Sequence, residues 1–551
     1  MAMNGITRRG AIAAISGAAI GLTKLATLKT WAADAGHPTA PVETASGKVR
    51  GMRAAGISTF LGIPYGADTS SCRFQPARAP QPWTGVRDCF TFGHRAPQLV
   101  NRMPGASASA NMTPAARFLL NITSHASMGS PQGEDCLVLN VWTPEASSRR
   151  KRPVMIRIHG GAWAVGSGET EDLSALCRKG DIVGVAMNHR INALGYLYLG
   201  AFHDDFVDSG NVGQLDLVLA LQWVRDNIAA FGGDPDNVTI SGESGGGWKT
   251  GALLGCVPAK GLFHKAIEES GSFVAAVELS DAVEVAEQTL KALGIAKADV
   301  HDLQKLDCMR VIEAALSVSP SRAEADPLVL RGLAPALDGR SMPAHPFKPA
   351  ATELSRHIPL IIGSNKDEAT LMMGFDSNFG TYTADAVQKQ FTAMLGAERG
   401  ARAFEIYRNR AADDQPTYWL SAISTDIAFR IGSIVEAERK AAQNAAPVFM
   451  YRFDYEAPVA GGVLRAFHGA EVSFVLNGSV SGEMAPTGPE QQGLADKMSQ
   501  AWLNFAHTGN PSQKGLEWPR YDGKARKTML FNKQNEAVSD PDRTTRVFWT
   551  A

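Results

Sequence analysis

The chain has 551 residues, which suits either one large enzyme domain with insertions or several smaller domains. Its 54 Lys and Arg residues balance 55 Asp and Glu residues to a formal charge of -1, so no sequence-wide field attracts nucleic acid or an anionic membrane. A hydrophobic fraction of 44%, with 54 glycines and 29 prolines, excludes a disordered or fibrous chain. We therefore expect a globular protein with a small-molecule partner.

The first 35 residues differ in character from the rest. Arg8 and Arg9 precede a mildly apolar run, 11–22, and the segment ends in the small residues of 33–35. This layout resembles a twin-arginine export signal, so we expect a bacterial protein that is exported to the periplasm or beyond. The alternative is an ordinary amphipathic N-terminal helix. The apolar run is shorter than the roughly 20 residues that span a bilayer, which predicts no stable membrane anchor.

Metal and nucleotide motifs are missing from the sequence. The six cysteines are scattered and contain no CxxC pair, which argues against a zinc site and a disulfide-built fold. The chain has no HExxH helix, EF-hand loop, GxxxxGK[ST] motif or strand-linked GxGxxG. We therefore predict no metal and no cofactor.

Short β-rich runs alternate with helical patterns from Val42 onward, which predicts a mostly parallel sheet flanked by helices, in a single α/β domain over 36–551. Three predicted strands, 153–158, 238–241 and 359–363, end in polar or glycine-rich segments. The carboxyl ends of parallel strands share one edge of a sheet, where ligands bind. The three segments should therefore face the same crevice.

Helical patterns fill much of the remaining chain. The spacing of apolar residues predicts a packing helix over 216–231, and the glycine pair that follows marks its end. Helix-rich segments around 275–354 and 381–444 are predicted to be insertions that form a cap over the crevice. A late strand over 448–453 and a C-terminal helix over 494–507 complete the prediction.

Ser244 is the predicted nucleophile. It lies in Gly242-Glu243-Ser244-Gly245-Gly246, a GxSxG motif between a predicted strand and a predicted helix over 248–255. In this nucleophile elbow the serine occupies a strained turn, and the glycines leave room for the backbone. The alternative is a glycine-rich turn with an idle serine.

A serine hydroxyl needs a base, and the base needs an orienting acid. After a nucleophile elbow the chain order is serine, acid, histidine. Glu368, at a predicted strand end, and His468 fit this order, but position alone does not choose among the histidines. Those that follow Ser244 are His264, His301, His345, His357, His468 and His507.

Several motifs in order resemble the type B carboxylesterase and cholinesterase-like family, which has the α/β-hydrolase fold. They are 134–141 (EDCLVLNV), 210–213 (GNVG) followed by Asp216, 231–235 (FGGDP), 242–246 (GESGG) and 365–368 (NKDE). The likeness extends from Gly47 to about Tyr521.

The resemblance implies catalytic roles for particular residues. The family's acid is the glutamate of an Asp-Glu pair, which matches Glu368 rather than the rival Asp367. Its base is the histidine of a His-Gly pair followed by an acidic residue, which matches His468 and Glu471. The implied catalytic triad is therefore Ser244, Glu368 and His468.

The family's oxyanion hole matches Gly161, Ala162 and Gly245. Two of these depart from the usual pattern, because Ala162 replaces a third glycine and Gly245 replaces a common alanine. Both keep a backbone N–H, so we expect the hole to survive with an altered shape.

The resemblance also bears on the cysteines. The family commonly bridges the cysteine that matches Cys136 to one at the position of Ala96. Because position 96 is alanine, we predict a substitute bridge from Cys89 to Cys136, with Cys72 as a competitor.

Three further residues lie near these motifs. Trp163 and Trp248 are predicted to wall the acyl or alcohol pocket, with core packing as the alternative. Ser270 resembles a family position that supports the triad. Together the resemblance implies a serine carboxylesterase that acts on a small-molecule ester through an acyl-enzyme. The alternatives are an amidase or peptidase with the same triad, or a non-catalytic cholinesterase-like binding protein.

Overall fold

The computed structural model describes residues 36–99, 113–126, 129–146, 149–320, 328, 332–478, 484 and 486–550. The predicted export signal at 1–35 lies outside these residues.

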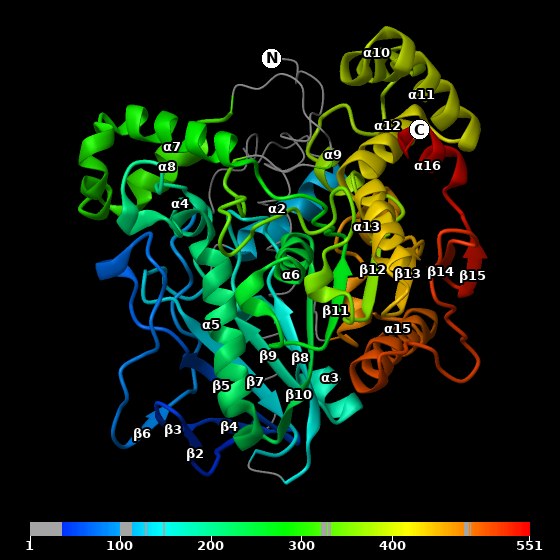
Figure 1. Ribbon diagram of the computed structural model, residues 1–551. Coiled ribbons are helices and arrows are strands. Elements are labelled where there is room, and N and C mark those ends of the chain that lie inside the picture. Colours follow the sequence, from blue (N-terminus) through cyan, green and yellow to red (C-terminus); the bar gives the residue numbers. More distant parts are fainter. Residues whose placement is uncertain are drawn as a thin grey trace.

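Within the described residues, most strands form one 12-stranded sheet (Figure 1). In order across the sheet they are β1 (His37–Pro38), β4 (Met52–Ala54), β5 (Ile57–Pro64), β7 (Val138–Thr143), β9 (Val183–Met187), β8 (Arg152–Ile158), β10 (Gly233–Glu243), β11 (Lys265–Glu269), β12 (Leu360–Asn365), β13 (Val448–Phe453), β14 (Lys527–Phe531) and β15 (Glu536–Ser539). A small second sheet contains β2 (Val42–Thr44), β3 (Gly47–Arg50) and β6 (Val86–Asp88).

The centre of the large sheet is parallel. Neighbouring strands from β9 to β14 run in the same direction, whereas the pairs outside this block are antiparallel. The predicted mostly parallel sheet is therefore confirmed. The three strands predicted to end near the site correspond to β8, β10 and β12, and the predicted strand 448–453 is β13.

Helices follow most of the parallel strands. The α-helices are α2 (Pro114–Ala126), α3 (Ser174–Gly180), α4 (Asn192–Tyr196), α5 (Val212–Asn227), α6 (Gly245–Leu254), α7 (Leu279–Leu293), α8 (Cys308–Ser317), α9 (Thr370–Met373), α10 (Ala384–Leu395), α11 (Ala397–Arg410), α12 (Pro416–Thr425), α13 (Ile431–Ala442), α14 (Val472–Val475), α15 (Pro489–Thr508) and α16 (Arg543–Thr550). A π-helix, η10 (Asp426–Arg430), joins α12 to α13.

Short 3-10 helices occupy many of the connections. They are η2 (Ser70–Cys72), η3 (Gly168–Thr170), η4 (Asp204–Phe206), η5 (Ser209–Asn211), η6 (Ile228–Phe231), η7 (Val257–Ala259), η8 (Lys297–Gln304), η9 (Glu353–Ser355) and η11 (Val459–Gly462). The predicted helix 216–231 is α5 continued by η6.

Two consecutive glutamates on β11 show how helices cover both faces of the sheet. Successive side chains of a strand point to opposite faces. Glu269 accepts a hydrogen bond from Trp502 of α15. Glu268 instead lies against Gly251 of α6 and beside Glu436 of α13. The buried core therefore lies in two layers, with α15 on one face and α6 and α13 on the other.

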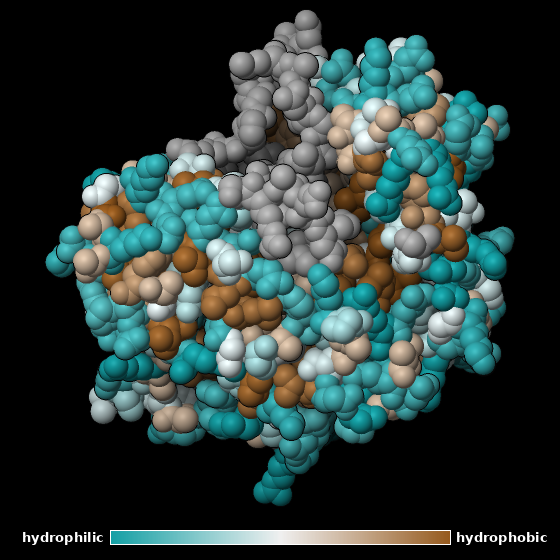
Figure 2. Space-filling model, turned by 45° about the horizontal axis from the view of Figure 1, so that its top comes forward, coloured by the Kyte–Doolittle hydropathy of each residue, from teal (hydrophilic) through white to brown (hydrophobic). Residues whose placement is uncertain are grey.

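The two segments predicted as insertions contain several helices, although the described residues 332–352 of the first segment form none. Helices α7 and α8 pack together with α4 around a small separate core. Helices α10, α11 and α12 pack against one another on the other side of the molecule (Figure 1). Figure 2 shows hydrophobic side chains exposed between these two groups and hydrophilic side chains on the outer rims. Among the described residues, no helix has the length and apolar character that a membrane crossing needs.

Candidate active site

Ser244 stands at the junction of β10 and α6, in a strained backbone conformation with φ 58° and ψ −123°. Its N–H donates to Glu269 O at 2.8 Å, and its carbonyl accepts from Trp248 N at 3.1 Å, which fixes the turn. A Cβ atom at Gly246 would overlap the carbonyl oxygen of Ile158 at the end of β8. The glycine of the motif therefore lets α6 begin directly against β8, with its N-terminal partial charge at Ser244.

His468 and Glu368, the predicted base and acid, meet beside this turn. His468 Nδ1 lies 2.6 Å from Glu368 Oε2, and both side chains are buried. The other carboxylate oxygen, Oε1, accepts from Asn365 N at 2.6 Å, so the loop after β12 holds the acid. The rival Asp367 has a carboxylate oxygen, Oδ2, without a hydrogen-bond partner among the described residues.

The predicted nucleophile and the predicted base share no hydrogen bond within the described residues. Ser244 Oγ and His468 Nε2 are both buried, and neither atom has a hydrogen-bond partner within the described chain. Nε2 instead lies 3.2 Å from Glu243 Oε1, in the residue before the nucleophile. Catalytic hydrogen bonds are often long in the free enzyme and tighten when substrate is bound.

Glu243 was not identified as a functional residue from the sequence. Burial raises its pKa well above the ordinary value, and the nearby carboxylates of Glu368 and Glu269 raise it further. Both effects favour the protonated form of Glu243. It occupies the variable position of the GxSxG pattern, so only its place between a buried strand and the serine could have signalled it.

A polar network connects the predicted support residue Ser270 to the histidine loop. Ser270 Oγ lies 3.4 Å from Glu471 Oε1, and the other oxygen of Glu471 accepts from Asn365 Nδ2. Asn365 Nδ2 also donates to Phe467 O at 2.7 Å, directly before His468. Ser270 therefore contacts Glu471, and Glu471 contacts Asn365, which holds the backbone just before His468.

The π-helix η10 supports the site from the segment predicted to be a cap. The ring of Phe429 lies 4.7 Å from the His468 imidazole, measured between centroids. Arg430 donates to the carbonyls of Asn365 at 2.7 Å and Lys366 at 2.9 Å, just before Glu368. π-Helical turns are frequent at functional sites, and this one orients both a ring and a cation toward the triad residues.

The glycine-rich loop after β8 lies directly against the nucleophile turn. A Cβ atom at Gly245 would overlap the backbone of Ala162. The backbone of residue 162 fills the space that the Cβ of an alanine at 245 would need, which explains the glycine at 245. The backbone N–H groups of Gly161, Ala162 and Gly245 donate no hydrogen bond within the described residues. They remain available for an oxyanion.

Both tryptophans singled out from the sequence are buried. Trp163 makes edge-to-face contacts with Tyr196 at 5.0 Å and Phe273 at 5.8 Å between ring centroids. Trp248 is 2% exposed within α6. Burial is compatible with a pocket wall and with core packing, so the pocket role of these residues stays a prediction.

The predicted bridge between Cys89 and Cys136 is wrong, because both thiols are free. The carbonyl of Cys89 accepts from Leu61 N inside β5, whereas Cys136 precedes Leu137, whose carbonyl accepts from Tyr65 N. The two cysteines are thus held at different positions, one beside Leu61 and the other just before Leu137. The free cysteines are Cys72, Cys89, Cys136, Cys177, Cys256 and Cys308.

One group of described side chains has the donor types and spacing of a metal site. The ligand atoms of His203, Asp205 and His301 lie within 4.8 Å of one another near the surface. The Asp205 carboxylate lies 3.0 Å from His301 Nε2, and the Asp205 N–H donates to His203 Nδ1 at 3.1 Å. These groups already act as partners for one another and share no residue with the triad.

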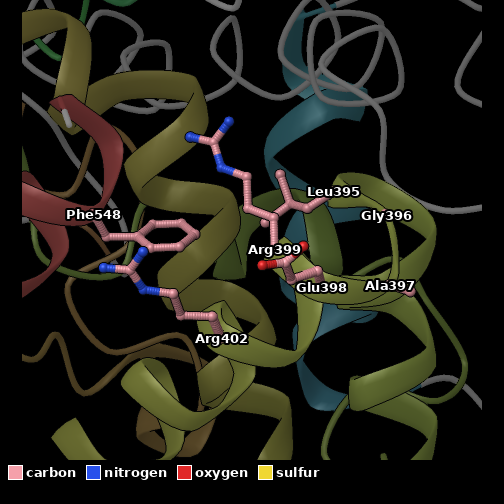
Figure 3. A pocket seen from close by; sticks show the side chains of 7 residues that line it. All are labelled: Leu395, Gly396, Ala397, Glu398, Arg399, Arg402 and Phe548. Carbon is pink, nitrogen blue, oxygen red and sulfur yellow. The ribbon is translucent and has the colours of Figure 1, made fainter.

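A surface pocket of about 460 Å³ also lies apart from the triad. It is formed by the turn between α10 and α11, by Arg399 and Arg402, and by Phe548 of α16 (Figure 3). The two guanidinium groups lie 5.3 and 5.7 Å from the Phe548 ring centroid, which is cation–π distance. These arginines therefore have structural partners at the surface.

Comparison with known proteins identifies the family of the chain. Residues 38–549 match the family described as "Carboxylesterase family". The chain is 33% identical to para-nitrobenzyl esterase of Bacillus subtilis over 511 residues, covering 92% of this chain and 97% of that protein. It is 31% identical to Carboxylesterase 1F of Mus musculus over 526 residues, 89% of this chain and 90% of that protein.

A solved structure shows the same architecture. The carboxylesterase EST55 of Geobacillus stearothermophilus has a TM-score of 0.76 and 34% identity, with 93% of this chain and 100% of that chain covered. Because the family match and the structural likeness both span nearly all of the described chain, the protein belongs to the carboxylesterase family and is a carboxylic-ester hydrolase with an α/β-hydrolase fold.

Proposed function

We propose that Ser244 is the nucleophile, His468 the general base and Glu368 the orienting acid of ester hydrolysis. The supporting observation is the 2.6 Å contact between His468 Nδ1 and Glu368 Oε2, beside a serine held in the strained turn. The contact directs the Nδ1 proton to the carboxylate, which leaves Nε2 free to take a proton from Ser244.

The reaction proceeds through an acyl-enzyme. As Ser244 Oγ bonds to the ester carbonyl carbon, its proton passes to His468 Nε2. When the bond to the alkoxy oxygen breaks, His468 returns the proton to the leaving alcohol. Water then gives a proton to His468 and attacks the acyl carbon, and Ser244 leaves with that proton as the carboxylic acid is released.

The N–H groups of Gly161, Ala162 and Gly245 bind the oxyanion of both tetrahedral intermediates. Their freedom from other hydrogen bonds within the described chain supports this role. Glu243 is close enough to His468 to compete as a proton acceptor, but its raised pKa favours the protonated form, which cannot accept. His468 is then the base that Ser244 meets.

The substrates that fit this site are uncharged carboxylic esters. The relative from Bacillus subtilis is named for para-nitrobenzyl esters, and aromatic rings at Trp163, Tyr196 and Phe273 lie next to the oxyanion loop. An apolar aromatic wall binds a neutral acyl or benzyl group through burial of apolar surface. We propose small aromatic and aliphatic esters as the class.

A panel of nitrophenyl esters of increasing acyl length, assayed on the wild type and on Ser244→Ala, tests the triad. We expect Ser244→Ala to lower kcat by about 10⁴-fold or more and to abolish labelling by a fluorophosphonate. Ser317→Ala, an exposed serine at the end of α8, is the matched control and should keep both. Activity or labelling retained in Ser244→Ala would exclude the proposed nucleophile.

The layout of residues 1–35 also supports export through the twin-arginine route. Replacement of both Arg8 and Arg9 by lysine should retain the protein in the cytoplasm, while the wild type reaches the periplasm or medium. Fractionation of bacteria that express the two chains distinguishes these outcomes. Equal export of both chains would contradict the proposal.

A further inference from the structure

Lys249 is a buried cation next to the active site that the proposed reaction does not use. It lies in the second turn of α6, five residues after Ser244, and its side chain is 0% exposed. Its Nζ donates to the carbonyl oxygen of His159 at 2.8 Å and reaches that of Gly160 at 3.5 Å. Both carbonyls belong to the loop that leads to the proposed oxyanion donors.

The direction of these hydrogen bonds matters for catalysis. In a trans peptide unit the C=O and N–H groups point in opposite directions. A donor that holds the carbonyl of Gly160 therefore turns the N–H of Gly161 to the other side of the loop. The Gly160 carbonyl also contacts His159 Nδ1 at 2.9 Å, so two side chains lie on the carbonyl side. Hydrogen bonds to a peptide carbonyl also polarise the N–H of the same unit.

The charge of Lys249 acts on the two imidazoles that lie beneath this loop. The rings of His159 and His189 stack at 4.8 Å, and burial followed by the charge of Lys249 lowers the pKa of both imidazoles well below the ordinary value. Glu171 is the acidic group whose charge acts on Lys249, but no hydrogen bond joins them within the described chain. Burial lowers the pKa of Lys249 itself to about 7.

We propose that Lys249 is a positioning residue of the oxyanion hole, which holds the carbonyls of His159 and Gly160 so that the Gly161 N–H faces the tetrahedral oxyanion. The inference rests on the proposed roles of Ser244 and Gly161. Burying a lysine without a hydrogen-bonded carboxylate is costly, which favours a role for the amine beyond packing. Its effect is largest where negative charge develops, in the transition state.

Two variants of Lys249 test the proposal. Lys249→Met keeps the length of the side chain but removes the donor, and Lys249→Gln keeps an amide donor on a shorter side chain. We expect Lys249→Met to lower kcat on a nitrophenyl ester by about 10- to 100-fold while KM changes by less than about twofold. Affinity for a trifluoromethyl ketone, which forms a tetrahedral adduct with the serine, should fall by the same factor. Lys249→Gln should show both losses in smaller measure.

Controls separate a positioning role from a structural one. Lys265→Met removes another buried lysine, at the start of β11, and should leave kcat and inhibitor affinity unchanged. If Lys249→Met does not fold, the same pairing of kcat loss with inhibitor loss is measured in Lys249→Gln. A kcat within twofold of the wild type, or a loss that appears in KM alone, would overturn the proposal. If Ser244→Ala stays active, the proposed function fails instead, whatever the Lys249 variants do.

Discussion

Two regions of the molecule bury charge in opposite ways. Around Ser244, carboxyl groups outnumber cations, and the arginine hydrogen-bonded to this cluster is Arg157 of β8. The carboxyl groups of this first region, called here the acidic cluster, belong to Glu171, Glu243, Glu269, Glu368 and Glu471.

Near the C-terminus the balance is reversed. Asp542, at the start of α16, lies 2.7 Å from Arg452, 2.8 Å from Arg410 and 3.8 Å from Arg430. Burial alone would raise the pKa of Asp542, but these arginines lower it far below the ordinary value. This group is called here the arginine cluster.

The difference separates two uses of buried ionisable groups. In the acidic cluster, burial and neighbouring carboxylates raise the pKa of Glu243 and Glu471, which favours the protonated forms close to His468. In the arginine cluster the carboxylate stays charged and connects α16 to β13 and η10. A site that moves protons holds weakly ionised acids, whereas a structural junction holds permanent charges.

Removal of Arg157, the cation of the acidic cluster, should have the largest effect on stability. Arg157 Nη1 donates to both carboxylate oxygens of Glu269 at 2.8 Å, and Nε donates to Glu171 at 3.2 Å. Arg157→Met leaves both acids buried without a counterion, which should lower the free energy of unfolding by about 3–5 kcal/mol. Urea denaturation followed by tryptophan fluorescence measures the loss.

A second substitution shows whether the unpaired charge is the cause. In the double variant Arg157→Met, Glu269→Gln, the amide oxygen still accepts from Trp502, and part of the lost stability should return. A cost below about 1 kcal/mol for Arg157→Met, or no recovery in the double variant, would contradict the assigned charge balance.

Sequence patterns predicted the parts of the site that depend on local rules. The β-branched runs identified β8, β10 and β12, and the glycine spacing identified the turn at Ser244, because neighbouring residues determine both. Glu368 and His468 are 100 residues apart, and no local rule joins them. Only the resemblance to a family selected this pair, which the structure brings to 2.6 Å.

The parts that sequence patterns missed depend on contacts between distant segments. Arg157 read as one residue of a strand, and Phe429 fell within a predicted cap, yet each contacts the cluster around His468. The predicted bridge from Cys89 to Cys136 failed for the same reason, since spacing along the chain does not determine a Cα separation.

The arginine cluster should respond more weakly to loss of its acid. In Asp542→Asn, Arg452 keeps Asp454 and Arg430 keeps Asp426 as partners, so we expect a loss of about 2–3 kcal/mol. A depressed pKa contributes stability above the unfolded value, near 4, that disappears as the pH falls. The difference between wild type and variant should therefore narrow below pH 4. Chemical denaturation at pH 7 and pH 3.5 checks this, and a gap that widens in acid would refute it.

The smallest effect is expected for an acid pair on the other face of the sheet. Glu268 of β11 and Glu436 of α13 are both buried, and three of their four carboxyl oxygens accept no hydrogen bond within the described chain. We expect the two groups to share a proton, which would pair two of these oxygens. Burial, and then Glu436, raises the pKa of Glu268 well above the ordinary value. The pair is therefore a two-residue version of the acidic cluster, in which the charges of Lys440 and Arg439 act on Glu436.

Glu268→Gln tests whether this pair behaves like the acidic cluster. Its side-chain amide donates a hydrogen bond to Glu436 but does not titrate. A carboxyl group whose pKa is raised by folding stabilises the native state at low pH, and this contribution is lost as the pH rises through the folded value. We expect similar melting temperatures for wild type and Glu268→Gln at pH 5. At pH 9 the variant should melt at a higher temperature, because its free energy of unfolding exceeds that of the wild type by about 1 kcal/mol. The exposed Glu517→Gln should track the wild type at both pH values. A melting-temperature difference independent of pH would mean that the pair does not share a proton. An excess of carboxyl groups over cations would then raise pKa values only around Ser244.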